Sequence, residues 1–347
     1  MEKRVFISFL FASCVAGFSM EEEEIFTELF SPMDYKLFKG LHVFDDDDNL
    51  VEMTFLDDPD ALEVTDDNIG ERVLFYLHTS KKPKNPELIY VNDTETLKKT
   101  SFDPKKPTRF VTHGWMNSHK SKACTLIRDA YLKHGDYNVI VIDWGNISCR
   151  PYFWASNQVK KIALYIADML NFLQRNGMNM SETVMAGHSL GAHAVGLAAR
   201  NCNGMIGYVV GMDPALPGYY LSGPGSRISS GDARHVEIIH TNAGLLGFLS
   251  AIGHCDYYPN GGAWQLGCIV DIGGACSHAR SFKYFAESIN SPVGFYATKC
   301  NNFTKFTTGL CKRGEQSVMG GLEKTFGTNG VYYLMTKASS PYAKGKK

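Results

Sequence analysis

Long hydrophobic runs are almost absent from this chain. Only one segment, Val5 to Phe18, is mostly apolar, and no later segment approaches the roughly eighteen uninterrupted apolar residues of a membrane-spanning helix. That segment is itself short for a membrane span. Basic residues precede it and small residues stand at its end, which is typical of a signal peptide. We therefore expect residues 1–19 to direct secretion to the extracellular space, with a single membrane anchor as the alternative.

The chain also lacks the Cys-x-x-Cys pairs that commonly bind zinc, although it contains 9 cysteines. Cys14 would leave with the signal peptide, and an even number would remain for disulfides in an oxidising compartment. The remaining cysteines are Cys124, Cys149, Cys202, Cys255, Cys268, Cys276, Cys300 and Cys311. The glycosylation sequons, which suit a secreted glycoprotein, begin at Asn92, Asn146, Asn179 and Asn302.

Basic residues are scarce in the segment 21–67, which holds 17 Asp and Glu but only 2 Lys. Residues 68–347 have the opposite balance, 31 Lys and Arg against 18 Asp and Glu, so the net charge of −1 hides a strong asymmetry. Blocks such as Asp45–Asp48 repel themselves and are typically solvated, so residues 20–67 are expected to form a disordered tail. The alternative is an acidic pro-segment lying on a basic catalytic domain, residues 68–347, which once freed would favour anionic lipid surfaces.

The apolar patterns predict an α/β fold. A hydrophobic share of 44% with 20% charged residues is ordinary for a globular chain, which excludes disorder for most of it. Strands alternate with helices, and this favours a mostly parallel central sheet covered by helices on both faces. We expect strands at 72–78, 108–112, 139–142, 206–212, 236–239 and 331–336, helices at 159–173 and 279–289, and a proline-containing loop at 81–87.

The segment from Thr183 to His193 reads as a strand, a Gly-x-Ser-x-Gly turn and a helix, which is the context of a nucleophile elbow. The turn is so tight that a Cβ at Gly187 or Gly191 would strike the neighbouring strand or helix. Ser189 is therefore expected to stand above a parallel sheet as the nucleophile of an esterase or lipase.

A serine hydroxyl is a poor nucleophile at neutral pH unless an imidazole takes its proton and a carboxylate orients that imidazole. In folds with this elbow the chain order is serine, acid, histidine. Asp213 stands just past the strand that follows the elbow, and it is the candidate acid. The alternative is that Asp213 only initiates a turn before Pro214.

The catalytic base must follow Asp213, and the histidines that do so are His235, His240, His254 and His278. His235 and His240 stand at the two ends of a short predicted strand, where each could be structural. His278 lies in a Cys- and Gly-rich loop directly before the last predicted helix, where a mobile side chain can reach across the edge of the sheet. His278 is therefore the candidate base.

The oxyanion of the reaction needs two backbone donors aimed at it. One is the N–H that follows the nucleophile, here that of Leu190, at the positive end of the elbow helix. The other should come from a loop after an earlier strand, and His113-Gly114-Trp115 fits this position. We assign this second donor to the Trp115 N–H.

Several ordered motifs resemble the pancreatic lipase family. The resemblance covers roughly residues 70 to 340 and includes 113–115, 187–193, 213–217 (Asp-Pro-Ala-Leu-Pro), 238–241 (Ile-Ile-His-Thr), 256–262 (Asp-Tyr-Tyr-Pro-Asn-Gly-Gly) and 276–281 (Cys-Ser-His-Ala-Arg-Ser). It implies an α/β-hydrolase fold with the catalytic serine, aspartate and histidine at Ser189, Asp213 and His278.

The resemblance also bears on the substrate. The family's lid is closed by two cysteines that match Cys268 and Cys276, which leaves a lid far too short to cover an active site. The segment from Thr241 to His254 is short as well, and both truncations resemble the secreted phospholipases A1. This implies hydrolysis of phospholipids at a membrane or emulsion surface, with triacylglycerol or galactolipid hydrolysis as alternatives. A lipid-binding or yolk-type homologue without activity is the non-enzymatic alternative.

Further expectations follow from the resemblance. Cys300 with Cys311 resembles a distal bridge of the family, and elimination then pairs Cys124 with Cys149 and Cys202 with Cys255. The family's calcium loop fails here, because two acidic ligand positions are occupied by Pro224 and Ser229 and leave Asp232 alone, so no metal or other cofactor is expected. Because few residues follow His278, we also expect no C-terminal β-sandwich domain of the kind that the pancreatic enzymes have. Neither a colipase-like partner nor a nucleic acid is expected.

Overall fold

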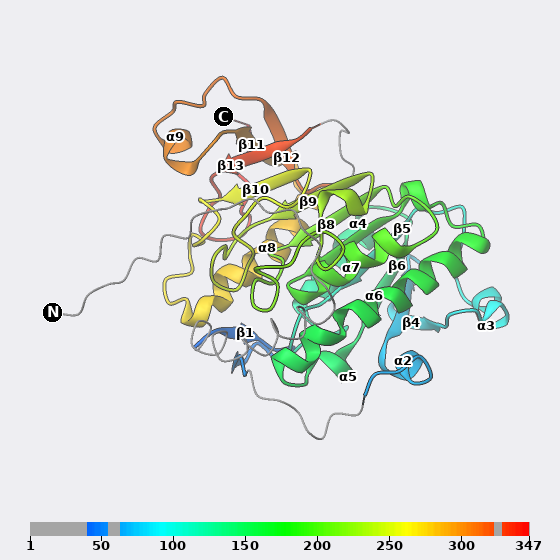
Figure 1. Ribbon diagram of the computed structural model, residues 1–347. Coiled ribbons are helices and arrows are strands. Elements are labelled where there is room, and N and C mark those ends of the chain that lie inside the picture. The colour runs from blue at the N-terminus through cyan, green and yellow to red at the C-terminus, as the bar shows by residue number, and fades with distance from the viewer. Residues whose placement is uncertain (1–39, 55–62, 323–327, 347) are drawn as a thin grey trace. The chain divides into compact units, whose positions relative to one another are not determined.

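The computed structural model describes residues 40–54, 63–322 and 328–346, all within one compact unit (Figure 1). The expected signal peptide, residues 1–19, and the acidic block Glu21–Glu24 lie outside the described residues. Among the helices that are described, none combines the length and apolar character required to cross a membrane.

The core of the fold is an 11-stranded sheet in the order β12-β11-β13-β10-β9-β8-β7-β5-β6-β3-β4. The strands from β13 to β6 in this order run parallel, whereas β3 and β4 at one edge and β11 and β12 at the other are antiparallel. This confirms the predicted mostly parallel sheet. Its strands are β3 (Leu74–Thr79), β4 (Lys82–Ile89), β5 (Thr108–Thr112), β6 (Asn138–Asp143), β7 (Val184–His188), β8 (Tyr208–Met212), β9 (His235–Ile239), β10 (Cys255–Pro259), β11 (Phe295–Lys299), β12 (Gln316–Met319) and β13 (Gly330–Leu334).

Helices cover both faces of the sheet, as predicted for an α/β-hydrolase (Figure 1). One face packs against α6 (Tyr152–Arg175) and α7 (Leu190–Asn201), and the other against α4 (Lys122–His134) and α8 (Ala275–Asn290). The shorter helices are α2 (Ile69–Arg72), α3 (Thr94–Lys99), α5 (Gly145–Ser148) and α9 (Phe303–Thr307). Helix α6 buries a continuous stripe of apolar side chains at helical spacing, which is why its periodicity is visible in the sequence.

The predicted loop at 81–87 is wrong from Lys82 onward, because β4 begins at that residue. The strand pairs with β3 on one side only and forms the edge of the sheet. Pro83 and Pro86 lack the backbone N–H that a central strand would donate, but an edge strand needs no such donor on its open side. Proline here marks the edge of the sheet and not a loop.

Helix α8 begins earlier than predicted, so His278 lies in its first turn and not in a preceding loop. The carboxylate of Asp271 fixes this start, since its Oδ1 accepts hydrogen bonds from the N–H groups of Cys276 (2.8 Å) and Ser277 (3.3 Å). These N–H groups have no partner within the helix, so a carboxylate here stabilises the first turn.

A short hairpin, β1 (His42–Phe44) and β2 (Leu50–Glu52), precedes the sheet. Its apolar side chains join the core, where Val43 and Met53 are buried. Gly273, just before α8, approaches this hairpin so closely that a Cβ there would lie 2.3 Å from the backbone nitrogen of His42. The prediction of disorder is therefore wrong for residues 40–54. These residues are part of the same compact unit as the sheet, so the predicted start of the catalytic domain at residue 68 is wrong as well.

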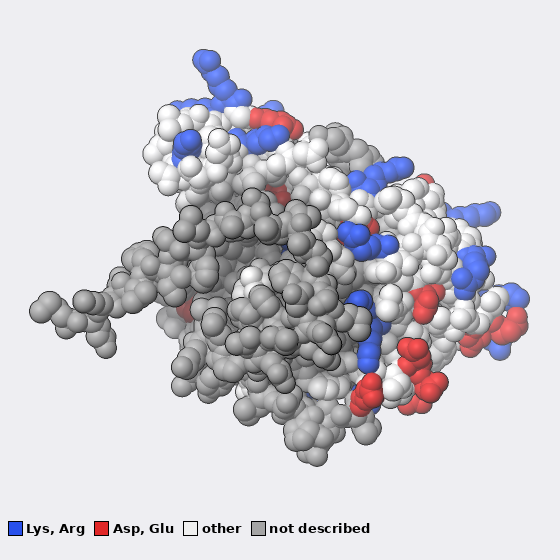
Figure 2. Space-filling model, in the orientation of Figure 1, with Lys and Arg blue, Asp and Glu red and all other residues white. Residues whose placement is uncertain are grey.

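Both signs of charge occur on the face shown in Figure 2, where the described basic and acidic side chains are scattered among neutral ones.

The hairpin contributes an ion pair between Asp48 and Lys122. This is one of the ion pairs that join the acidic segment to the basic part of the chain. An acidic segment in contact with a basic domain was one interpretation of the charge asymmetry, and for this turn the contact exists.

Candidate active site

Ser189 occupies the sharp turn between β7 and α7. Its backbone is in a strained region, with φ 57° and ψ −123°. A Cβ on Gly187 would lie 2.2 Å from the carbonyl oxygen of Gly191, and a Cβ on Gly191 would lie 2.1 Å from that of His113. Both distances are impossible for a real side chain, so the steric reason for two glycines in the Gly-x-Ser-x-Gly turn holds in the structure.

Asp213 follows β8 and is fully buried, with a positive φ of 47°. Its Oδ1 accepts hydrogen bonds from the backbone N–H groups of Thr241 (2.7 Å) and Asn242 (3.1 Å). Its Oδ2 accepts one from His278 Nδ1 at 2.6 Å. A buried carboxylate with several donors is held in one orientation, so Asp213 does more than initiate a turn.

His278 is almost completely buried and presents its two ring nitrogens to different environments. Nδ1 faces the carboxylate of Asp213, an acceptor, and therefore carries a proton. Nε2 has no hydrogen-bond partner among the described residues, and His278 lines the same cavity as Ser189. The ring is thus oriented with its lone pair at Nε2 available for a proton.

The other candidate histidines have structural partners. His240 Nε2 lies 2.9 Å from Asp256 Oδ1, and its Nδ1 donates to the carbonyl oxygen of Phe248 at 2.8 Å. His235 stacks on His254, with ring centroids 5.4 Å apart. These contacts hold loops and strand ends together, and none of the three histidines lines the cavity that Ser189 and His278 share.

Two further histidines flank Ser189 in sequence. The ring of His188 lies 4.4 Å from that of His278, and its Nε2 is 3.3 Å from the carbonyl oxygen of His278. Burial and the neighbouring His278 lower the pKa of His188 well below its usual range. Burial also lowers the pKa of His193 to about 3, and its Nε2 donates to the carbonyl oxygen of Ala215 at 2.8 Å. Both rings are therefore neutral at physiological pH.

The loop 113–115 lies against Ser189, which is the position that the predicted oxyanion loop requires. A Cβ on Gly114 would lie 2.7 Å from Ser189 Cβ and 3.3 Å from Ser189 Oγ. The His113 ring fixes the loop, since Nδ1 donates to the Gly114 carbonyl (2.9 Å) and Nε2 accepts from the Trp144 N–H (3.1 Å). Leu190 is the first residue of α7, so its N–H has no partner within that helix.

Asp143, at the end of β6, is a site-supporting residue that the sequence reasoning missed. It accepts a hydrogen bond from His119 Nδ1 and lies 3.4 Å from Nε2 of His113. Burial raises the pKa of Asp143, but the contacts with His113 and His119 outweigh it and hold that pKa well below its usual range. An acidic residue that ends a fully apolar strand was the available signal, because such a residue needs a buried partner.

A cavity of about 180 Å³ opens beside Ser189 and His278. This is less than the roughly 300–1,000 Å³ of pockets that enclose a whole small ligand, so only part of a large substrate fits inside. The hairpin turn forms part of the wall, an involvement that the sequence did not suggest. Besides Ser189 and His278 the lining includes Gly114 and Trp115, Phe282 and Lys283 of α8, Lys122 of α4, and Val43, Phe44, Asp45 and Asp48 of the hairpin.

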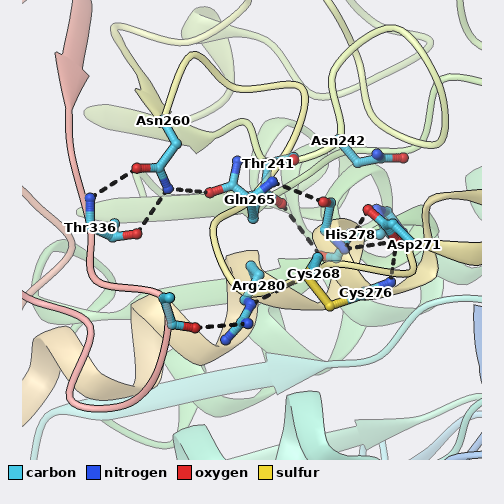
Figure 3. The surroundings of a disulfide bond; sticks show 12 residues. Thr241, Asn242, Asn260, Gln265, Cys268, Asp271, Cys276, His278, Arg280 and Thr336 are labelled. Atoms are coloured by element: carbon cyan, nitrogen blue, oxygen red, sulfur yellow. Dashed lines mark hydrogen bonds between the residues drawn. A yellow bond between two sulfur atoms is a disulfide. The ribbon is translucent and has the colours of Figure 1, made fainter.

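The predicted lid disulfide between Cys268 and Cys276 is present, and polar contacts fix both ends of the loop it closes (Figure 3). Gln265 donates from Nε2 to the carbonyl oxygens of Thr241 (3.1 Å) and Pro259 (2.9 Å). Asp271 caps α8 from inside the loop. A loop this short and this well anchored has little freedom to swing across the serine.

Apolar side chains are exposed on this lid and on the neighbouring loop. Ile269 is 95% exposed and Val270 76%, while Leu249, in the loop after β9, is 61% exposed. A Cβ on Gly274 would lie 2.9 Å from Leu245 Cδ2, which places the two loops side by side. Clustered exposed apolar side chains commonly mark a surface that contacts a partner or a membrane.

The disulfide between Cys300 and Cys311 is present as expected, but the two pairings by elimination are wrong. Cys202 Sγ hydrogen-bonds to the Gly204 carbonyl (3.1 Å) beside the α7 face, whereas Cys255 belongs to the core on the α8 face. The sheet separates these two thiols. Cys124 is a buried residue of α4 and Cys149 is exposed after α5, and neither forms a disulfide.

The remaining predicted positions are all at the surface or otherwise engaged. The asparagines of the four sequons, Asn92, Asn146, Asn179 and Asn302, are accessible to solvent, so their glycosylation stays a prediction. Asp232 accepts hydrogen bonds from Arg200 Nε and the Ser229 N–H, both at 2.7 Å. In the part of the chain that the structure describes, no three His, Cys, Asp or Glu side chains are grouped to hold a metal ion.

Comparisons with known proteins find similar sequences among pancreatic lipases. Pancreatic triacylglycerol lipase of Cavia porcellus is 32% identical over 262 residues, 69% of this chain and 56% of that protein. The same lipase of Homo sapiens is 33% identical over 260 residues, 68% of this chain and 56% of that protein. Inactive pancreatic lipase-related protein 1 of Canis lupus familiaris is 33% identical over 268 residues, 71% of this chain and 57% of that protein.

The chain spans somewhat more than half the length of these relatives. A solved structure of a putative hydrolase of the alpha/beta superfamily from Xanthomonas campestris pv. campestris covers 39% of the chain and 71% of that structure, at 15% identity and a TM-score of 0.31. The family model named Lipase matches residues 42–342, starting at the first strand of the hairpin. The chain belongs to the Lipase family.

Proposed function

We propose that this protein is a secreted serine hydrolase that cleaves carboxylic esters of lipids, with a preference for phospholipids. The observation that carries the proposal is the arrangement of His278, whose Nδ1 is 2.6 Å from the buried Asp213 while its Nε2 is unpartnered among the described residues, in the cavity that Ser189 lines. A silent homologue is the less favoured alternative, because Ser189, Asp213 and His278 are all present and the Asp213 carboxylate holds the His278 ring in place.

In the proposed reaction Ser189 Oγ attacks the ester carbonyl while His278 Nε2 takes the hydroxyl proton. Asp213 stabilises the imidazolium that forms and keeps the ring in the required tautomer. His278 then gives the proton to the departing alcohol, which leaves an acyl group on Ser189. Water attacks this acyl-enzyme with His278 again as base, and the fatty acid leaves.

The negative charge that develops on the carbonyl oxygen would be bound by the N–H groups of Trp115 and Leu190. Gly114 lies directly against Ser189, so the loop 113–115 is near enough for the Trp115 N–H to reach the carbonyl oxygen of the bound ester. Each donor of this kind contributes about 2.7–4 kcal/mol to lowering the barrier. The Trp115 side chain is held separately, by donation from Nε1 to the Arg150 carbonyl at 2.7 Å.

The surface around the cavity supports the proposed lipid class. The relatives are named as triacylglycerol lipases, and the exposed apolar lid and its neighbouring loop suit contact with a lipid surface. The short, anchored lid leaves room for a bulky charged head group, which favours a phospholipid over a triacylglycerol. Triacylglycerol hydrolysis is the second candidate, and it rests on the names of these relatives.

The test is release of fatty acid by the purified chain from phosphatidylcholine and from triolein emulsions in parallel, with Ser189→Ala as the control. We expect faster release from phosphatidylcholine and a loss of several powers of ten with Ser189→Ala on either substrate. A faster rate on triolein would overturn the phospholipid preference alone. Activity that survives Ser189→Ala, or no release from either lipid, would overturn the proposed hydrolase.

A further inference from the structure

Four charged side chains line the cavity together with Ser189 and His278. They are Asp45 and Asp48 in the hairpin turn, Lys122 at the start of α4 and Lys283 in α8, and together they are called the charged mouth below. Cleavage of a neutral ester requires none of these charges. Two carboxylates and two ammonium groups at one cavity therefore need another explanation.

The ion pair between Asp48 and Lys122 is the accessible part of the charged mouth. Their side chains are 50% and 51% exposed. An ion pair this exposed contributes only about 0–1 kcal/mol, so a ligand that carries both signs of charge can open it at small cost. Lys283 is more enclosed, and burial with the nearby Arg280 and Lys122 lowers its pKa while Asp48 raises it.

The hairpin turn is fixed in position before any ligand arrives. Asp45 Oδ1 accepts hydrogen bonds from the N–H groups of Asp47 (2.9 Å) and Asn49 (2.8 Å), which shapes the turn. The Phe44 carbonyl accepts from Asn117 Nδ2 at 2.9 Å, which ties the turn to the loop after Trp115. Asp48 is therefore presented on a rigid support, and ordering it on binding costs little.

We propose that the charged mouth is a subsite for the zwitterionic head group of a phospholipid, with the phosphate facing Lys122 and Lys283 and the quaternary ammonium facing Asp48. The inference rests on the proposed phospholipid hydrolysis. The buried Nε2 of His278, unpartnered among the described residues, marks where the reacting ester lies in the same cavity. The cavity of about 180 Å³ is too small for acyl chains as well, so these lie outside it, toward the exposed apolar loops.

A zwitterion fits the charged mouth better than an anion or a neutral lipid does. An anionic head group such as glycerol phosphate satisfies the two lysines but meets the carboxylate of Asp48 without a compensating charge. Triacylglycerol has no charge to offer to either side. The subsite therefore gives selectivity for phosphatidylcholine by favourable pairing and against phosphatidylglycerol by repulsion.

The experiment compares kcat and KM on phosphatidylcholine and phosphatidylglycerol with identical acyl chains, in mixed micelles, for the wild type and Asp48→Asn. Asp47→Asn is the matched control, because Asp47 is exposed in the same turn and does not line the cavity. Lys122→Gln is compared in the same way with Lys120→Gln, since Lys120 is exposed and also outside the cavity. Hydrolysis of p-nitrophenyl butyrate, a small neutral ester, reports on the catalytic groups alone.

For Asp48→Asn we expect the ratio of kcat/KM on phosphatidylcholine to that on phosphatidylglycerol to fall about tenfold, through KM. For Lys122→Gln we expect kcat/KM to fall about tenfold on both phospholipids. On p-nitrophenyl butyrate we expect kcat/KM of both variants to stay within about twofold of the wild type. The control variants Asp47→Asn and Lys120→Gln should stay within the same twofold range on all substrates. Glycerophosphocholine should inhibit p-nitrophenyl butyrate hydrolysis competitively in the wild type and more weakly in Asp48→Asn.

Three results would overturn the subsite. Suppose that Asp48→Asn and Asp47→Asn have the same ratio of kcat/KM on phosphatidylcholine to that on phosphatidylglycerol, and that the wild type hydrolyses phosphatidylcholine. The head-group subsite is then wrong, and the proposed phospholipase activity stands. If the wild type hydrolyses p-nitrophenyl butyrate but neither phospholipid, the proposed phospholipid preference fails and the subsite fails with it. Absence of inhibition by glycerophosphocholine in the wild type also contradicts the subsite.

Discussion

Replacement of Asp213 by asparagine should separate the role of this carboxylate in catalysis from its role in folding. The Thr241 N–H points at Oδ1, the Asn242 N–H is shared between Oδ1 and Oδ2 at 3.1 Å each, and His278 Nδ1 points at Oδ2. The asparagine would keep its carbonyl oxygen toward the two backbone donors and turn its amide NH₂ toward His278. Nδ1 must then accept a hydrogen bond, so the ring carries its proton on Nε2 and cannot take one from Ser189.

The size of the effect follows from this wrong tautomer. The same exchange in serine proteases of the Ser-His-Asp type lowers kcat about 10⁴-fold, which corresponds to roughly 5.5 kcal/mol of barrier. The introduced amide oxygen would still accept from Thr241 and Asn242, so the free energy of unfolding should fall by only about 1–3 kcal/mol, the difference between a charged and a neutral hydrogen bond. Hydrolysis of p-nitrophenyl butyrate and urea unfolding measure the two quantities on the same protein.

Asp256→Asn is the matched control for this variant. Asp256 is also buried, contacts a histidine (His240 Nε2, 2.9 Å) and accepts backbone donors from Ile252 (2.9 Å) and Gly253 (3.0 Å). We expect Asp256→Asn to lose similar stability but to keep activity within about tenfold, because His240 does not line the cavity. If Asp213→Asn loses less than tenfold in kcat, or if both variants lose activity equally, the assigned role of Asp213 is refuted.

Three further predictions follow from the site and its surroundings. Gly114→Ala should lower kcat on p-nitrophenyl butyrate at least about 100-fold, because the new Cβ would lie 2.7 Å from Ser189 Cβ. Gly223→Ala, whose new Cβ has no atom within 4 Å, should leave this kcat unchanged. The pKa of Asp143 in the folded chain lies below its ordinary value of 3.8, so its contribution to stability is present above pH 3.8 and is lost as the pH falls below it. The difference in free energy of unfolding between the wild type and Asp143→Asn, measured by urea titration, should therefore shrink as the pH is lowered. Iodoacetamide should label Cys149 in the native chain and Cys124 only after unfolding, and equal labelling of both in the native chain, measured by peptide mass spectrometry, would contradict the burial of Cys124.

The residues of the candidate site could be predicted because their constraints are local. The Gly-x-Ser-x-Gly turn needs glycines at fixed positions for steric reasons, and both glycines can be recognised from the amino-acid order alone. The order serine, acid, histidine then left few choices for Asp213 and His278. Strand β6 was equally visible, because a strand buried on both faces is apolar for most of its length. Strand β5 was recognised as a short run rich in β-branched residues.

The features that were missed depend on contacts between distant parts of the chain. The hairpin was hidden because four consecutive aspartates dominate its turn, although Val43 and Met53 on either side are buried. The contact that stabilises the turn joins Asp46 to the Ser118 N–H at 3.0 Å, across 72 positions of sequence. Similarly, His113 and His119, which contact Asp143, lie in the loop between β5 and α4, and His119 is 24 positions from Asp143 in sequence. Neither spacing nor periodicity predicts such a contact.

The most direct test of the proposed hydrolase is covalent trapping of the nucleophile with an alkyl fluorophosphonate, followed by peptide mass spectrometry. The reagent reacts with a serine only where an adjacent base removes the hydroxyl proton. We expect one label per chain, on Ser189, with no labelling of Ser189→Ala and slow labelling of Asp213→Asn. Labelling of another residue, or no labelling of a preparation that hydrolyses ester, would contradict Ser189 as the nucleophile.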